Sequence, residues 1–114
     1  MSTVNPEIVS ESVDSNRAEF DIRVPADLYY LQGHFPGEPV LPGVIQLHWA
    51  IQLADEHLNL KPSFAGLEAL KFHRIIKPET RLRLVLELNE ESGKLTFSYT
   101  SESGKHSQGR VLFE

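Results

Sequence analysis

The chain has 114 residues, 40% of them hydrophobic and 24% charged, so we expect a single globular domain over residues 1–114. The absence of cysteine excludes disulfides, thiolate nucleophiles and zinc–thiolate sites, and it fits a reducing compartment. The net charge of −5 argues against non-specific binding to nucleic acid. No apolar run is long enough to span a bilayer, and residues 1–12 lack the regions of a signal peptide, so we expect the cytoplasm.

Two short strands are predicted near the start of the chain, over residues 4–9 and 18–24. In the second of these, Phe20, Ile22 and Val24 alternate with polar residues, which is the period of a half-buried strand. Residues 32–43 then contain three glycines and three prolines. This composition predicts a long, ordered loop rather than a helix or a central strand, and long loops inside compact domains are often functional.

A helix is predicted from about residue 43 to residue 58. Its apolar residues form two stripes, namely Val44, Leu47, Ile51, Ala54 and Leu58, and Ile45, Trp49 and Leu53. Together these stripes cover most of the circumference, which predicts a helix buried on several sides. Gln46, His48 and Gln52 also lie in this helix, and His48 and Gln52, which share a mostly apolar face, must find hydrogen-bond partners or water.

The second half of the chain predicts four strands. The first covers residues 64–76, and the next three show a clear period of two over residues 81–88, 94–99 and 109–113. Turns are predicted at residues 92–93 and 103–104. An antiparallel sheet wrapped around one helix satisfies this order of elements, so the expected fold class is α+β.

Five basic residues fall within thirteen positions and are opposed there only by Glu79. They are Lys71, Arg74, Lys77, Arg81 and Arg83. Such a segment is either a solvated strand face or a docking patch for an acidic partner.

Candidate chemistry gathers where the loop meets the helix. His34 lies in the loop, while His48 and Gln52 lie one turn apart on the helix. The backbone N–H groups of Gly43 and Val44 have no intrahelical partner and lie at the positive end of the helix dipole, where they can hold a developing oxyanion. Each feature also has an ordinary explanation: a surface or structural histidine, and N–H groups capped by water or a side chain.

Residues 33–44 carry the pattern HFPG…P…PGV, which resembles the signature loop of the bacterial 3-hydroxyacyl-acyl carrier protein dehydratases of fatty-acid synthesis, a family with the hot-dog fold. Residues 48–52 resemble the E-A-x-A-Q segment of the family's helix, and residues 71–74 and 77–78 resemble its KFRR and PGD elements. The resemblance spans roughly residues 28–88. Within it, residues 42–50 are similar to a divergent subgroup, the dehydratases of aryl-polyene and related pathways.

The resemblance implies a reaction and a site. A 3-hydroxyacyl thioester on an acyl carrier protein would lose water to give the trans-2-enoyl thioester, without a metal or redox cofactor. His34 matches the histidine that removes the C2 proton, Gly43 and Val44 match the oxyanion region, and Gln52 matches a glutamine that positions the second catalytic group.

The resemblance also implies partners. The family's active site lies at a dimer interface, with the histidine from one subunit and the helix from the other, so we expect a homodimer or a heterodimer with another hot-dog subunit. An acidic acyl carrier protein would favour a docking role for the basic segment. Neither nucleic acid nor membrane is expected as a partner.

One position departs from the family pattern. His48 stands fourteen residues after His34, where the family has Glu or Asp. Imidazole can perform acid–base chemistry near neutrality, so His48 could orient or protonate the leaving hydroxyl, or it could mark a weak or redirected activity. Two alternatives therefore stay open: a hot-dog acyl thioesterase, and a weakly active or non-catalytic subunit of a heterodimeric dehydratase.

Overall fold

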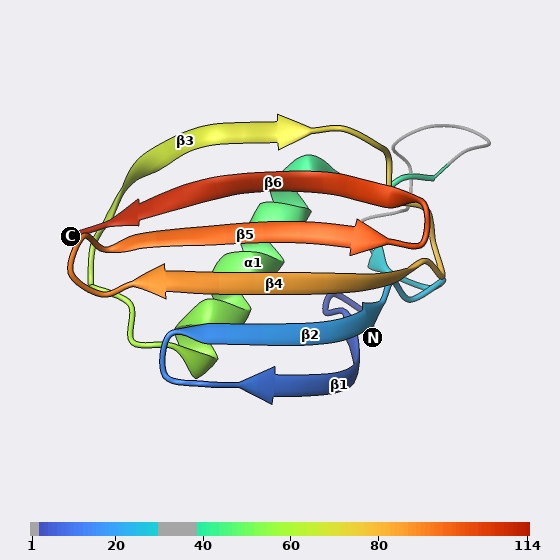
Figure 1. Ribbon diagram of the computed structural model, residues 1–114. Coiled ribbons are helices and arrows are strands. Elements are labelled where there is room, and N and C mark those ends of the chain that lie inside the picture. The colour runs from blue at the N-terminus through green and yellow to red at the C-terminus, as the bar shows by residue number, and fades with distance from the viewer. Residues whose placement is uncertain (1–2, 30–38) are drawn as a thin grey trace.

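The computed structural model describes residues 3–29 and 39–114 of the chain. The elements within them are β1 Glu7–Val13, β2 Arg17–Arg23, α1 Gly43–His57, β3 Phe64–Phe72, β4 Arg81–Asn89, β5 Lys94–Ser101 and β6 Gly104–Phe113. The six strands form one sheet in the order β1-β2-β4-β5-β6-β3, and every neighbouring pair is antiparallel. The helix α1 runs diagonally across one face of this sheet (Figure 1). This is the expected α+β, hot-dog arrangement.

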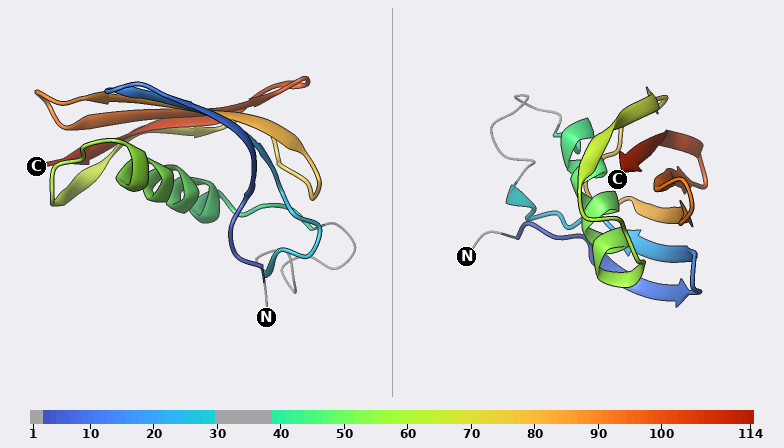
Figure 2. Two further views of the ribbon diagram at one scale, coloured as in Figure 1. Left: turned by 90° about the horizontal axis from the view of Figure 1, so that it is seen from below. Right: turned by 90° about the vertical axis from the view of Figure 1, so that its left-hand side faces the viewer.

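The core lies between α1 and the sheet, as the two views of Figure 2 show. Because side chains alternate along β2, β4 and β5, most of their apolar residues reach the face that carries the helix; Phe20, Leu84 and Phe97 are buried there. Trp49 and Ala50 of α1 are fully buried against them. Burial of a large apolar side chain stabilises the fold by roughly 1.5–3 kcal/mol, so this face supplies most of the stability.

The predictions of α1 and of the strands β2, β4 and β5 agree with the structure to within a few residues and are confirmed. The last strand is confirmed as well, but β6 begins at Gly104, five residues before its predicted start. The first strand is misplaced: β1 covers Glu7–Val13 and pairs with β2 as far as Val13. All seven of its residues are exposed, so no burial pattern marks its position in the sequence. The predicted strand over residues 64–76 is too long, because β3 ends at Phe72.

The prediction that α1 is buried on several sides is wrong for the single chain. Its buried residues, Gln46, Trp49, Ala50, Leu53 and Ala54, form one face, whereas Val44 is 69% exposed. Leu47 and Ile51 are only partly buried against the core. An apolar stripe predicts that this face of the helix is buried, but it does not indicate whether the burying residues belong to the same chain. No helix of the part that the structure describes is long and apolar enough to cross a membrane.

Candidate active site at the start of the helix

The first turn of α1 begins without a side-chain cap. Pro42, the N-cap residue, is extended and has no polar side-chain group, and the first turn contains no acidic residue. The N–H groups of Ile45 and Gln46 donate to the Pro42 carbonyl at 3.1 and 3.2 Å. Among the described residues no group accepts a hydrogen bond from the N–H of Gly43 or Val44. The first turn itself therefore supplies no negative charge to balance the positive end of the helix dipole.

A surface depression of about 490 Å³ opens beside this turn. Residues 40–43 and Gln46 line one side of it, and residues 72–75 line the other. A Cβ atom on Gly43 would lie only 2.7 Å from Cζ of Phe72. Glycine therefore lets the Phe72 ring pack directly against the helix start, and this contact joins the end of β3 to the two candidate N–H donors.

The connection after β3 is fixed by His106, which is 4% exposed. Its backbone carbonyl accepts from the N–H groups of His73 and Arg74 at 2.8 and 3.2 Å. Its Nδ1 lies 3.1 Å from the Ile75 carbonyl, and its Nε2 lies 2.6 Å from Oγ of Ser101. Because a carbonyl can only accept, Nδ1 carries the proton, and Nε2 accepts from the serine hydroxyl.

A β-bulge explains why strand alternation does not predict that this histidine is buried. Tyr99 pairs with Ser107 and Thr100 pairs with Lys105, so His106 is the extra residue between two pairs. A bulge of this kind re-aims a side chain, and here His106 and Ser107 are both buried although they are neighbours in a strand. Strand alternation alone predicts that only one of them is buried.

Gln46 is the buried polar residue of α1, at 3% exposure. Its Nε2 donates to the Leu41 carbonyl at 3.2 Å, and its Oε1 accepts from Oγ of Ser107 at 2.7 Å. Its backbone carbonyl accepts from the Tyr99 hydroxyl at 2.6 Å. Burial raises the pKa of Tyr99 far above its ordinary value, so the phenol stays protonated as a donor.

His48 and Gln52 lie on a different face of α1. Together with Val44 they have the spacing i, i+4, i+8, which places all three in one stripe that starts at the first turn. His48 is exposed and Gln52 is half-buried. Neither side chain makes a hydrogen bond or ion pair with a residue in the described ranges. His34, the proposed base, lies outside the described residues, so its place relative to this stripe stays a prediction.

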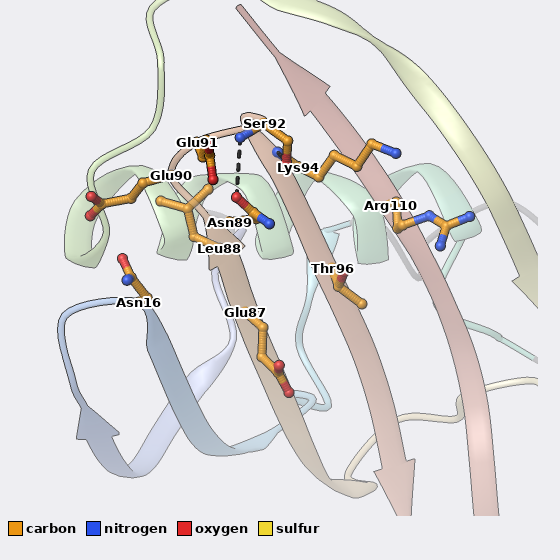
Figure 3. Close-up of a pocket in the computed structure, with 10 residues that line it drawn as sticks. All are labelled: Asn16, Glu87, Leu88, Asn89, Glu90, Glu91, Ser92, Lys94, Thr96 and Arg110. Atoms are coloured by element: carbon orange, nitrogen blue, oxygen red, sulfur yellow. Dashed lines mark hydrogen bonds between the residues drawn. The ribbon is translucent and has the colours of Figure 1, made fainter.

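Another surface depression lies on the sheet face opposite α1. It measures about 660 Å³ and is lined by charged and polar residues of β4, β5 and β6 and of two turns (Figure 3). Three of its charged residues are in ion pairs: Glu87 pairs with Arg17, while Lys94 and Arg110 both pair with Glu68. Glu90 and Glu91 also line it and form no ion pair with a described residue. Because it lies on the face opposite α1, remote from the helix start, we assign no chemistry to it.

One helix packed on a six-stranded antiparallel sheet, with a free helix start, defines the chain as a hot-dog protein. Residues 10–110 match the ApeI-like family, described as ApeI dehydratase. This match covers most of the chain, and the protein therefore belongs to the ApeI-like dehydratase family.

Curated relatives are 3-hydroxyacyl-acyl-carrier-protein dehydratases. FabZ of Chloroflexus aggregans is 37% identical over 79 residues, which cover 63% of this chain and 55% of the relative. FabZ of Clostridium novyi is 35% identical over 92 residues, which cover 75% of this chain and 65% of the relative. The chain therefore spans less than two thirds of the length of either relative.

Two solved structures are similar over nearly the whole chain. The dehydratase heterocomplex ApeI:P from Xenorhabdus doucetiae matches with a TM-score of 0.89 and 29% identity, covering 96% of this chain and 97% of that one. An uncharacterized protein from Erwinia carotovora subsp. atroseptica matches with a TM-score of 0.84 and 33% identity, covering 94% of both chains.

Proposed function

We propose that this chain dehydrates 3-hydroxyacyl thioesters on an acyl carrier protein to trans-2-enoyl thioesters, in fatty-acid or aryl-polyene-like biosynthesis. The match of residues 10–110 to a dehydratase family carries the proposal. The uncapped start of α1 supports it, because the reaction needs hydrogen-bond donors for a developing oxyanion. The compartment we propose, on the sequence evidence alone, is the cytoplasm.

The proposed reaction is a β-elimination. His34 removes the C2 proton, the electron pair of that bond forms the C2=C3 double bond, and the C3 hydroxyl leaves with a proton as water. While C2 loses its proton, negative charge grows on the thioester oxygen, and the N–H groups of Gly43 and Val44 stabilise it; one such donor is worth roughly 10²–10³ in kcat. No metal or redox cofactor takes part, and the acyl group arrives on the phosphopantetheine arm of the carrier protein.

His48 is the proposed second catalytic group, with Gln52 positioning it. One of its ring nitrogens can protonate the leaving hydroxyl when the imidazole is charged, or orient it when the imidazole is neutral. In the single chain His48 is exposed, whereas a group that orients a substrate works best where water is excluded. We therefore propose that a second subunit completes the site around the stripe of Val44, His48 and Gln52.

The exposed edge of the sheet supports a second hot-dog subunit as that partner. β3 is an edge strand, and apolar side chains on it and just after it are more than one third exposed, namely Phe64, Leu67, Leu70, Phe72 and Ile75. An edge strand of this kind offers unpaired backbone groups together with apolar surface. The partner is either a second copy of the chain or a different hot-dog chain.

The basic segment divides into two parts. Arg83 belongs to the ion-paired outer face, because its Nε lies 3.2 Å from Oδ1 of Asp21, and Arg81 also acts on that carboxylate. Lys71, Arg74 and Lys77 are exposed, and none of them forms an ion pair with the residues in 3–29 and 39–114. Arg74 lines the depression at the helix start. We propose that these three residues, rather than Arg81 and Arg83, attract the acidic carrier protein.

A second candidate is a weakly active or non-catalytic subunit of a heterodimeric dehydratase. Two observations favour it: His48 occupies the position where the family carries a carboxylate, and the similar ApeI:P structure is a heterocomplex. In that case the chain would supply surface, or one half of a site, to a different hot-dog subunit.

The deciding experiment follows acyl mass after incubation of the purified protein with a 3-hydroxyacyl-acyl carrier protein. Loss of one water, abolished in a folded His34→Ala variant, would establish dehydration. No mass change by the pure chain, with activity regained on adding a second hot-dog subunit, would favour the heterodimer. Release of the whole acyl group, with free carrier thiol, would instead indicate a thioesterase. A His34→Ala variant with an unchanged rate would refute His34 as the base.

A further inference from the structure

We infer that Gln46 and Ser107 are positioning residues: they hold the peptide before α1 so that the N–H groups of Gly43 and Val44 point into the neighbouring depression. The inference rests on the proposed function for its catalytic consequence, but the geometry that it predicts can be tested without substrate. It gives a role to a polar helix residue that the proposed reaction does not otherwise use.

Both backbone groups of Leu41 are held. Its N–H donates to the Ile76 carbonyl at 2.8 Å, and its carbonyl accepts from Nε2 of Gln46 at 3.2 Å. The next residue, Pro42, has φ at −61°, a torsion fixed by its ring. Little rotational freedom therefore remains between Leu41 and the N–H of Gly43. The anchor on Leu41 thus sets the direction of the first free N–H group.

Gln46 can act as this anchor because it is itself fixed from the sheet. Ser107 of β6 donates to its Oε1 at 2.7 Å, and this bond also fixes the orientation of the side-chain amide. Tyr99 of β5 donates to its backbone carbonyl at 2.6 Å. The helix start is thus tied to two central strands through buried hydrogen bonds, which hold geometry more firmly than solvated ones.

An apolar residue in place of Gln46 could fill the same volume, but it could not form hydrogen bonds to both Leu41 and Ser107. Pro42 has no side-chain acceptor or donor, so the usual cap at this position is missing. Gln46 stabilises the turn from inside the helix and leaves the N–H groups of Gly43 and Val44 free. A side-chain cap from the N-cap residue would instead have occupied a first-turn N–H group, so capping from within keeps these donors available for an oxyanion.

The test compares Ser107→Ala and Gln46→Leu with the control Ser98→Ala. Ser98 lies on β5, is half-buried and makes no side-chain hydrogen bond with a described residue. Without substrate, we expect the Gly43 amide resonance in a ¹H–¹⁵N spectrum to shift or broaden in the first two variants and to stay unchanged in the control. With 3-hydroxyacyl-acyl carrier protein, we expect kcat to fall about tenfold or more while KM stays within about twofold, because full loss of an oxyanion donor costs roughly 10²–10³.

The outcomes separate the two proposals. Folded Ser107→Ala and Gln46→Leu variants with an unchanged Gly43 resonance and unchanged kcat would overturn the positioning role, and so would a rise in KM alone. If Gln46→Leu does not fold, Ser107→Ala decides, since it removes only one hydroxyl. If the wild-type protein shows no dehydration with any hot-dog partner, the proposed function fails, while the Gly43 resonance still decides whether Gln46 and Ser107 orient the helix start.

Discussion

The two edges of the sheet, β1 and β3, are both exposed but are built differently. On β1, Glu7 pairs with Arg23, and Nε2 of His57 at the end of α1 lies 3.1 Å from the Glu11 carboxylate, with which it pairs when the imidazole is protonated. Val9 falls at a register shift, so the strand is bulged there. Paired charges and a bulge are the means by which proteins keep an edge strand from pairing with another chain.

β3 also carries two register shifts and an ion-paired Glu68, but it differs in the apolar surface that it exposes. Its exposed side chains include two phenylalanines and two leucines, and its end contacts the helix start through Phe72 and Gly43. The surface available to a partner is therefore continuous with the candidate site, whereas the surface on β1 lies at the far edge of the sheet (Figure 1). This difference supports the proposal that a second subunit packs at β3 rather than at β1.

The largest expected effect comes from placing one charge on each edge. Leu67 on β3 and Val9 on β1 are 42% and 44% exposed, so they form a matched pair. We expect Leu67→Lys to weaken subunit association at least 100-fold, because an unpaired charge buried in an interface costs about 3–5 kcal/mol, and to lose activity with it. Val9→Lys should leave both unchanged. Light scattering after size-exclusion chromatography measures the association, and equal effects at both edges would contradict the assignment of β3 as the interface.

The contact between β3 and the helix start gives the next largest effect. In Gly43→Ala the new Cβ would lie 2.7 Å from Cζ of Phe72, so either the ring or the helix start must move. We expect kcat to fall about tenfold and the free energy of unfolding to fall by roughly 1–3 kcal/mol, as is typical of overpacking. Adding Phe72→Leu should recover part of both losses. Full activity in Gly43→Ala would show that the position of the helix start does not matter.

The features that could be predicted from the sequence are those that neighbouring residues determine. The period of two in β2, β4 and β5 and the loop before the helix are local patterns, so the elements and the free N–H groups of Gly43 and Val44 could be located. The partners of Gln46 could not, because Ser107 and Tyr99 lie 61 and 53 residues further along the chain. Only the sheet order brings them to the helix start.

The sequence also could not predict which strands form the edges of the sheet, or which face of α1 the single chain leaves exposed. Val44 and Leu47 are apolar, and an apolar residue predicts cover without naming its source; here the single chain leaves Val44 69% exposed. His106 is buried through a bulge, which interrupts the alternation that strand prediction uses. The roles of His34, His48 and Gln52 stay predictions from the resemblance.

A smaller effect should distinguish Arg74, which forms no ion pair with a described residue, from Arg83, which pairs with Asp21 on the outer face. We expect Arg74→Glu to raise KM for the carrier-bound substrate about tenfold at low salt, because charge reversal removes attraction and adds repulsion, and the difference should shrink at high ionic strength. Arg83→Glu should change KM less. A short thioester not attached to carrier protein should show no difference between the two variants; a loss with that substrate would mean that Arg74 acts inside the site.

The smallest effect concerns how β1 is held. Oγ of Ser10 on β1 donates to Asp21 of β2 at 2.8 Å, and this bond, with Arg83 of β4, lowers the pKa of Asp21 below its ordinary value of 3.8. A lowered carboxyl pKa stabilises the fold above the unfolded value, and this contribution is lost as the pH falls through the folded one. Since Asp21 is partly exposed, we expect Asp21→Asn to lower the free energy of unfolding by less than about 1 kcal/mol at pH 7.

Urea titrations at several pH values would measure this, and the difference from wild type should fade below about pH 4, near the ordinary carboxyl pKa. Ser10→Ala is the control for the edge: because it removes the donor, it should reproduce part of the loss with the same pH dependence. An Asp21→Asn effect that persisted in acid would contradict the charge-based account. Activity should survive both changes, since β1 lies at the edge of the sheet remote from β3 and the helix start.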